Sequence, residues 1–347
     1  MRSEPSPNKQ NDPRKHHYVP VFYQLGFTEL DGLFWVYDRR ARTYKRLHPR
    51  VVCCEKDLYS IRPENAAADR RVESLFLSHV DGIGSRAFSR IQVGKTPTRD
   101  VAEAISLFTA LQFVRLPSVG KVVAAMHERS ADELMRISFA SVERATQVLE
   151  RYARETGTAL NTSPESMVEA VRGKHVQAVA TEMPFLHNML EQVVPIGKMI
   201  MELGWEMLVA PLETSFITCD SPVVIVPRKG EKVVGFKVPG AAKYFPLSRQ
   251  LCLRLGDPIP SFLYRNVDDE TVRTINQNVA ANSERFIMGP ARVQLEDIVS
   301  SSGSTDADAS PRFTFETVEA DADSSLQKMT FHARRSFYPT DGSMHGP

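Results

Sequence analysis

The chain has 347 residues, which is enough for one large domain or two ordinary ones with a substantial buried core. Hydrophobic residues make up 42% and charged residues 24%, a composition typical of globular proteins. The formal net charge of +1 excludes a global attraction to nucleic acid or acidic membranes, so nucleic acid could bind only through a local basic patch. No run reaches the roughly 18 apolar residues of a transmembrane helix, so no membrane association is expected. The composition identifies no protein partner.

The N-terminal segment and the cysteines indicate the expected location. Residues 1–14 are rich in Pro, Ser, Asn and charge without an apolar stretch, which predicts a disordered leader and not a signal peptide. The four cysteines lack a paired CxxC spacing, which argues against a zinc ribbon or a secreted disulfide framework. A cytoplasmic protein is therefore expected, with Cys54 and Cys219 as buried apolar side chains.

The first third after the leader predicts short strands. Residues 33–38 alternate after a turn at Asp31 and Gly32, and residues 43–47 and 50–54 continue the pattern as a small meander. From about residue 68 to 92 the apolar residues recur every three or four positions, as in an amphipathic helix.

The middle of the chain, residues 98–203, is predominantly helical by the same criterion. Breaks are expected at Pro117, at residues 156–157 and 163–164, and at Pro184 and Pro195. Period-two segments follow, with one helix at residues 268–282. The strand candidates are residues 205–209, 215–218, 223–226, 250–255 and 285–288.

Separation of the elements along the chain predicts an α+β fold: an N-terminal strand meander, a central helical bundle, and C-terminal antiparallel strands with one helix. A single domain is expected over residues 15–290. Residues 291–347 are expected to form a mostly flexible acidic tail, because residues 300–308 are of low complexity. Two alternating runs in this tail, residues 313–318 and 329–332, could add an edge hairpin.

Several motifs resemble one known family. Residues 16–20 read HHYVP and are followed by FYQL at 22–25; residues 215–224 read SFITCDSPVV and residues 244–248 read YFPLS. Together with Ile275 and Asn276, these motifs are similar in order and spacing to the bacterial family named domain of unknown function 4238. Two departures are Val21, where the family usually has glutamine, and residues 219–221 (CDS), where Ser-Asp-Asn is typical. The resemblance implies no activity, because the family has none assigned.

Three common chemistries lack their minimum motif in this sequence. There is no glycine-rich loop ending in Gly-Lys-Ser/Thr to hold phosphates. There is likewise no Gly-x-Ser-x-Gly nucleophile turn and no HExxH zinc helix. Nucleotide hydrolysis through a phosphate-binding loop, serine hydrolysis and this class of metalloprotease are therefore disfavoured.

The adjacent His16 and His17 are the first candidates for chemistry, since imidazole binds metals and transfers protons near neutral pH. Successive residues of an extended segment point to opposite faces, so at most one imidazole should face the interior. That imidazole is either a ligand or general base, or a structural donor that fixes the N-terminal segment to the core.

Asp220 is the second candidate, because it follows a strand-like run and precedes Pro222. A carboxylate at a strand end can project into a cleft, but it can also cap its own backbone in a turn. We expect the histidine motif and the Asp220 loop to converge on one cleft. This arrangement allows a divalent metal, although no metal or other cofactor is specified by the sequence.

Gln112 and Arg115 lie three residues apart on an apolar helix. A buried arginine must either form an ion pair, here with Glu73 or Asp81, or bind an anionic ligand. Asn276 on the last helix is a candidate for ligand binding or for a structural hydrogen bond. Five basic residues around residues 39–46 could follow a nucleic-acid backbone or form a solvated face: Arg39, Arg40, Arg42, Lys45 and Arg46.

From these residues we expect a hydrolase acting on phosphodiesters, nuclease-like and metal-assisted in one version. His16 or His17 would be the base or a ligand, Asp220 the second carboxylate and Arg115 the anion clamp, with Gln112 and Asn276 near the ligand. The alternative is a non-catalytic ligand- or partner-binding protein with a structural histidine motif.

Overall fold

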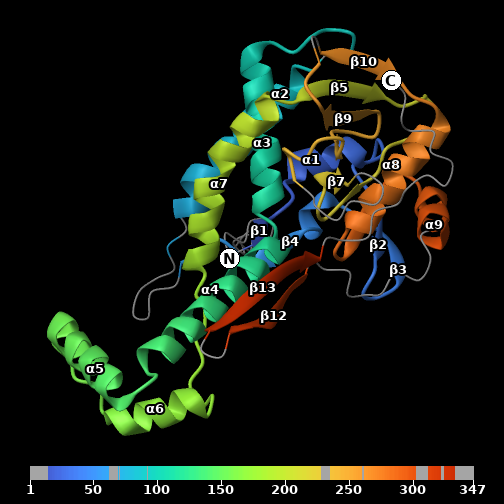
Figure 1. The fold of residues 1–347 in the computed structure, drawn as a ribbon. Coiled ribbons are helices and arrows are strands. Elements are labelled where there is room, and N and C mark those ends of the chain that lie inside the picture. Colours follow the sequence, from blue (N-terminus) through green and yellow to red (C-terminus); the bar gives the residue numbers. More distant parts are fainter. Residues whose placement is uncertain are drawn as a thin grey trace, which may run out of the picture. The chain divides into compact units, whose positions relative to one another are not determined.

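A computed structural model describes residues 15–61, 69, 71–91, 93–227, 235–259 and 262–301, and the backbone of 312–321 and 324–332. It confirms the α+β class, with small N-terminal sheets, helices α2 to α7 in the middle, and a C-terminal mixed sheet with helices (Figure 1). The leader predicted at residues 1–14 lies outside the described residues. Within the described chain no single helix is long and apolar enough to cross a membrane; the bent pair α3 and α4 passes by length and composition alone.

Contacts divide the chain into two compact units, residues 119–188 and the remainder. The first unit contains most of α4 (Pro117–Ser138), then α5 (Val142–Thr156), α6 (Pro164–Arg172) and the start of α7 (Met183–Met201). A small core of Phe139, Ala145 and Val168 joins these helices. The predicted break at Pro195 is wrong, because α7 continues through this residue. The single domain over residues 15–290 stays a prediction.

The other unit begins with a two-stranded ribbon, in which β1 (Lys15–His17) pairs antiparallel with β4 (Cys54–Lys56). Between them lie α1 (Val21–Gln24), the 3₁₀ turn η1 (Leu25–Phe27), and the hairpin of β2 (Phe34–Asp38) and β3 (Thr43–Leu47). The strand predicted at 50–54 is mostly wrong. A second 3₁₀ turn, η2 (Pro49–Val51), occupies this segment, because Pro49 restricts the backbone and the His48 side chain accepts from Arg50 N.

Two long helical segments follow the ribbon. The first starts as a stretch of π-helix, η3 (Val72–Leu77), and continues as α2 (Ser78–Ser89). The second is α3 (Arg99–Val114), which packs closely on α2: Gly84 of α2 faces Phe108 of α3 so closely that a Cβ at Gly84 would lie 2.7 Å from the Phe108 ring. This contact brings the polar residues of the two helices together.

The C-terminal sheet has five strands in the order β10-β5-β9-β8-β7. The strands are β5 (Gly204–Val209), β7 (Val224–Val226), β8 (Ala242–Pro246), β9 (Leu251–Gly256) and β10 (Leu263–Asn266). The predicted antiparallel arrangement is wrong for one pair, because β10 runs parallel to β5. After β9 the chain reverses direction and crosses β5 before it forms β10 at the edge of the sheet. Because β9 is antiparallel to β5, this reversal makes β10 parallel to β5.

A four-stranded sheet, β3-β2-β11-β6, combines the N-terminal hairpin with two strands from the C-terminal half of the chain. In it β11 (Phe286–Gly289) pairs with β2 and with β6 (Thr218–Cys219). One core cluster includes side chains of both sheets, α8 (Asp269–Asn282) and α9 (Arg292–Ser301). The prediction of a single C-terminal helix is wrong, since α9 occupies part of the predicted tail. The backbone of β12 (Arg312–Asp321) pairs antiparallel with β13 (Ser324–His332).

Candidate functional site

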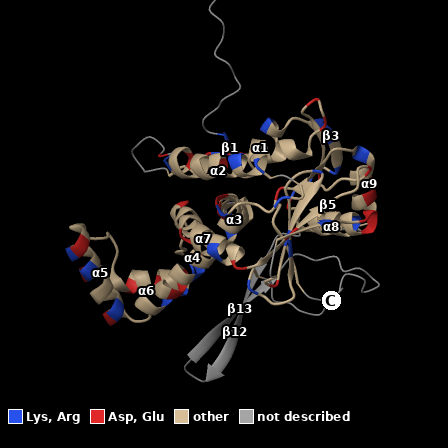
Figure 2. Cartoon of the chain, turned by 90° about the horizontal axis from the view of Figure 1, so that it is seen from above, with Lys and Arg blue, Asp and Glu red and all other residues tan. Residues whose placement is uncertain are grey.

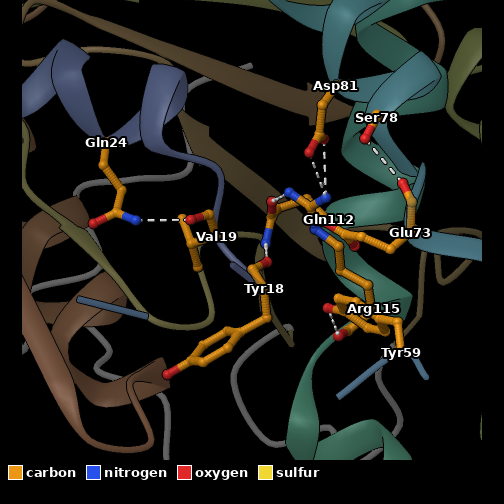
Figure 3. Close-up of polar contacts among 9 residues, drawn as sticks. All are labelled: Tyr18, Val19, Gln24, Tyr59, Glu73, Ser78, Asp81, Gln112 and Arg115. Atoms are coloured by element: carbon orange, nitrogen blue, oxygen red, sulfur yellow. Dashed lines mark hydrogen bonds and ion pairs between the residues drawn. The ribbon is translucent and has the colours of Figure 1, made fainter. Parts of the chain in front are cut away.

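A buried ion pair at the C-terminal end of α3 is the centre of the candidate site. The Arg115 side chain is fully buried; its Nη1 lies 2.9 and 3.2 Å from the two carboxylate oxygens of Asp81 on α2. Its Nη2 donates to Gln112 Oε1 at 2.6 Å. We call the residues around this pair the Arg115 cluster: His16, Tyr59, Glu73, Asp81, Gln112 and Arg115. Figure 3 shows all of them except His16. The predicted internal ion pair of Arg115 is therefore present, with Asp81 as its partner.

The histidine motif is attached to this cluster through backbone groups. Tyr59 N donates to His16 Nδ1 at 3.0 Å, and the two rings stack with centroids 5.7 Å apart. The Tyr59 hydroxyl donates to Arg115 O at 2.8 Å, and Gln112 Nε2 donates to Tyr18 O at 2.8 Å. The buried His16 thus holds the N-terminal segment against the loop after β4, but in this contact it accepts from a backbone N–H group and is not the donor expected from the sequence.

Glu73 contributes a carboxyl group with altered acidity. It lies in the π-helical stretch η3, where the Ser78 hydroxyl donates to Glu73 O at 2.9 Å. Burial raises the pKa of Glu73 to about 7, and the charge of Arg115 opposes this shift. Burial also raises the pKa of Asp81, again against Arg115. π-Helical stretches occur often at functional sites, and carboxyls with a pKa near neutrality suit acid–base chemistry.

Glu73 and Arg115 each contribute to the Arg115 cluster a buried atom whose hydrogen-bonding capacity is unused. Glu73 Oε2 is an acceptor and Arg115 Nε is a donor, and neither has a hydrogen-bond partner among the described residues. Buried polar atoms are nearly always paired, so such atoms mark a place where a water or a polar ligand group fits. Glu73 is half-buried as a residue, although its Oε2 atom is buried.

His17 lies on the other face of β1 from His16. Its Nε2 lies 3.2 Å from Arg50 O; because a carbonyl oxygen only accepts, Nε2 carries the proton and Nδ1 is left as an acceptor. Burial lowers the pKa of His17, and the nearby charges of Lys15 and Arg115 lower it further. The imidazole is therefore neutral at pH 7 and held in one tautomer.

The cross-strand neighbours of His17 are basic or nucleophilic. His17 is paired with Cys54, and Lys15 with Lys56, so alternation along the ribbon places all four side chains on one face. Burial raises the pKa of the Cys54 thiol, although Lys15 hydrogen-bonds to it and opposes the shift. Cys219 is buried as expected, whereas Cys54 is only half-buried.

Asp220 makes a different set of contacts, although it is also buried. Its carboxylate accepts from three consecutive backbone groups: Glu284 N at 2.8 Å, Arg285 N at 2.7 Å and Phe286 N at 3.1 Å. Its own N–H donates to Phe286 O at 3.1 Å. This aspartate joins the end of β6 to the start of β11, and its carboxylate has a structural function.

Asn276 is likewise engaged with backbone. Its Oδ1 accepts from Ile217 N at 3.0 Å and its Nδ2 donates to Ser215 O at 2.9 Å, so it holds α8 against the segment before β6. The structure therefore brings His16, Gln112 and Arg115 together in one cluster. Asp220 and Asn276 are not part of this cluster, and each hydrogen-bonds to backbone groups elsewhere. Tyr18 is near both: its carbonyl accepts from Gln112, and the charge of Asp220 contributes to its raised pKa, after burial and Cys53.

Two functional candidates were not assigned a role from the sequence. Glu73 was noted only as an ion-pair partner for Arg115, and its position in a π-helical stretch has no clear sequence signal. Tyr59 lies in an irregular segment after β4, where no periodicity indicates burial. In the described part of the chain, no group of three or more His, Cys, Asp and Glu side chains is placed to hold a metal ion. A divalent metal at Asp220 stays a prediction.

The motifs in these contacts agree with a comparison to known families. The family model described as protein of unknown function DUF4238 matches residues 15–292, so the chain belongs to this family. The matched region contains the histidine motif, the Arg115 cluster and the Asp220 loop. No curated protein and no solved structure showed a significant match to the chain.

Proposed function

We propose that the protein is a hydrolase acting on phosphodiesters through general acid–base chemistry, with His17 as the base and Glu73 as the acid. The observation that carries the proposal is the pair of unused buried atoms, Glu73 Oε2 and Arg115 Nε, in one cluster. The charge of Arg115 also acts on the His17 imidazole, whose pKa it lowers. These residues replace Asp220, the carboxylate expected from the sequence, whose oxygens accept from backbone N–H groups.

The two titrating groups have complementary protonation states. His17 is neutral with Nδ1 as an acceptor, so it can take a proton from an attacking water. Glu73 keeps its proton up to about pH 7, so it can give that proton to the leaving oxygen. The water oxygen forms a bond to phosphorus and the ester P–O bond breaks. One proton passes from the water to His17, and one passes from Glu73 to the leaving oxygen. Residue pairs whose environments shift their pKa values in opposite directions are typical of such acid–base roles.

The charge of the phosphate would be met by nearby cations. Arg115 Nε is a donor without a partner among the described residues, while its two terminal nitrogens hold Asp81 and Gln112 in place. Lys15 and Lys56 lie on the same exposed ribbon face as His17. Lysine binds phosphate as a point charge, which suits an exposed position at the edge of a site.

Turnover of bis(p-nitrophenyl) phosphate tests this assignment. We expect Glu73→Gln and His17→Ala each to lower kcat/KM by about 100-fold or more, the usual contribution of one acid or base group. The exposed pair Glu150→Gln and His127→Ala is the matched control and should leave kcat/KM unchanged. The wild-type pH profile should fall on its alkaline side through the pKa of Glu73, about 7.

A second candidate function is non-catalytic binding of a ligand or partner. It is favoured by the backbone contacts of His16, Asp220 and Asn276, which give three of the expected site residues a structural role. Wild-type protein without turnover, or a Glu73→Gln variant with unchanged turnover, would overturn the acid–base assignment and leave binding as the better candidate.

A further inference from the structure

The turn between β2 and β3 carries basic side chains that the proposed site does not use. Arg40, Arg42 and Lys45 are exposed, and no described carboxylate forms an ion pair with any of them. Arg46 of the same hairpin differs, because Glu29 and Asp31 both pair with it. Positive charge without an ion-pair partner among the described residues therefore lies at the turn and at Lys45 of the edge strand β3. Figure 2 shows basic positions near β3.

Hydrogen bonds fix the backbone of the turn that carries these side chains. Asp38 Oδ1 accepts from Arg40 N at 3.0 Å and Ala41 N at 3.2 Å, while its Oδ2 accepts from Arg285 Nη2 at 2.8 Å. Arg39 N donates to Arg285 O at 2.8 Å, which ties the turn to the loop before β11. Below the turn, Phe34 and Val36 are buried in the core. The backbone of the turn is therefore held by hydrogen bonds to Asp38 and Arg285, unlike that of a flexible solvated loop.

The geometry points to the β2–β3 turn as a docking surface for the sugar-phosphate backbone of a nucleic acid, with Arg40, Arg42 and Lys45 contacting successive phosphates. A regular polyanion is the partner that matches several exposed cations that form no ion pair among the described residues. Docking through phosphates is independent of sequence and depends strongly on salt. This inference names nucleic acid as the substrate class of the proposed hydrolase. Binding does not depend on the proposed function, and only cleavage of the bound strand rests on it.

Fluorescence anisotropy with a labelled single-stranded DNA 20-mer tests the docking surface directly. The triple variant Arg40→Gln, Arg42→Asn, Lys45→Gln removes the three charges; asparagine is chosen because Arg42 has a φ of 52°, which asparagine tolerates. The control removes the same net charge from three exposed arginines that each pair with a glutamate: Arg99→Gln, Arg136→Gln, Arg151→Gln.

We expect wild type and the control to bind alike, and the hairpin variant to bind at least about tenfold more weakly at low salt. The slope of log affinity against log salt should fall by about 0.7 for each lost phosphate contact, or about 2 in total. Equal binding by all three proteins, or binding of anionic lipid vesicles and not of the oligonucleotide, would overturn the inference. Cleavage is measured separately: binding without cleavage contradicts the proposed hydrolase alone, and cleavage unaffected by the hairpin variant contradicts the docking surface alone.

Discussion

Asp220 and Arg115 are both buried ionisable side chains, yet their surroundings differ. Asp220 accepts from three consecutive backbone N–H groups. The Arg115 cluster combines an arginine, two carboxyl groups and an imidazole. In it Glu73 Oε2 and Arg115 Nε are buried without a hydrogen-bond partner among the described residues. A saturated buried charge stabilises a fold, whereas an incompletely satisfied one is typical of a site that receives a ligand.

Removal of the Asp220 carboxylate is expected to have the largest effect on stability. Asp220→Ala leaves three partly buried N–H groups at the start of β11 without an acceptor, and a fully buried group of this kind costs about 1–3 kcal/mol. We expect the free energy of unfolding to fall by about 3–5 kcal/mol in urea denaturation. Asp297→Ala, at an exposed position of α9, should change it by less than about 0.5 kcal/mol. A loss below about 1 kcal/mol for Asp220→Ala would contradict a structural function.

Removal of the Arg115 charge should cost somewhat less. Arg115→Leu leaves the Asp81 carboxylate without its partner, but that side chain is 25% exposed and can be hydrated or protonated. We therefore expect a loss of about 2–4 kcal/mol in the free energy of unfolding. The double variant Arg115→Leu, Asp81→Leu removes both charges and should recover part of this loss. Arg115→Leu with wild-type stability and weaker ligand binding would instead support an anion clamp that is independent of Asp81.

Local sequence patterns predict many of the helices and strands, but they do not predict which strands pair with one another. The periods of α3 and α8 predict both helices, because an amphipathic helix repeats within a few residues. The pairing of β11 with β2 joins residues about 250 positions apart, and the parallel β10 depends on a skipped strand position. No local pattern records either pairing, because both depend on which edges remain available after the rest has packed.

The candidate site shows the same limit. Arg115 and Gln112 stand out in the sequence because charge or amide on an apolar helical face must be satisfied. Which carboxylate satisfies Arg115 could not be decided, since Glu73 and Asp81 lie about two turns apart on the same helical segment. The side-chain placement resolves it: Asp81 forms the ion pair and Glu73 remains in a partly desolvated position, where its pKa is raised.

The Glu73 carboxyl should have a smaller effect on the free energy of unfolding, and this effect should depend on pH. Its folded pKa of about 7 is above the ordinary 4.5, so the folded state holds a proton that the unfolded state has lost between these values. Stability from this group is therefore present below about pH 4.5 and falls as the pH rises to about 7. Glu73→Gln removes this dependence, and it should be more stable than wild type by about 1–2 kcal/mol at pH 8, after allowance for partial exposure. Parallel stability curves from pH 4 to 8 would contradict the raised pKa.

The smallest expected effect concerns Cys54, whose labelling reports on the His17 face without altering the fold. Cys53, Cys219 and Cys252 are buried, and only Cys54 is half-buried, so native protein should react with one equivalent of a thiol reagent and denatured protein with four. Because burial raises the pKa of Cys54, its labelling rate should increase with pH beyond the ordinary value of 9.0. Lys15→Met removes the hydrogen bond that opposes this shift and should slow labelling at pH 8 by a few-fold. Cys54→Ser is the control and should abolish the native-state reaction. Labelling of a second thiol in native protein would show that the ribbon opens, and that His17 is not held against Arg50 as the proposed base requires.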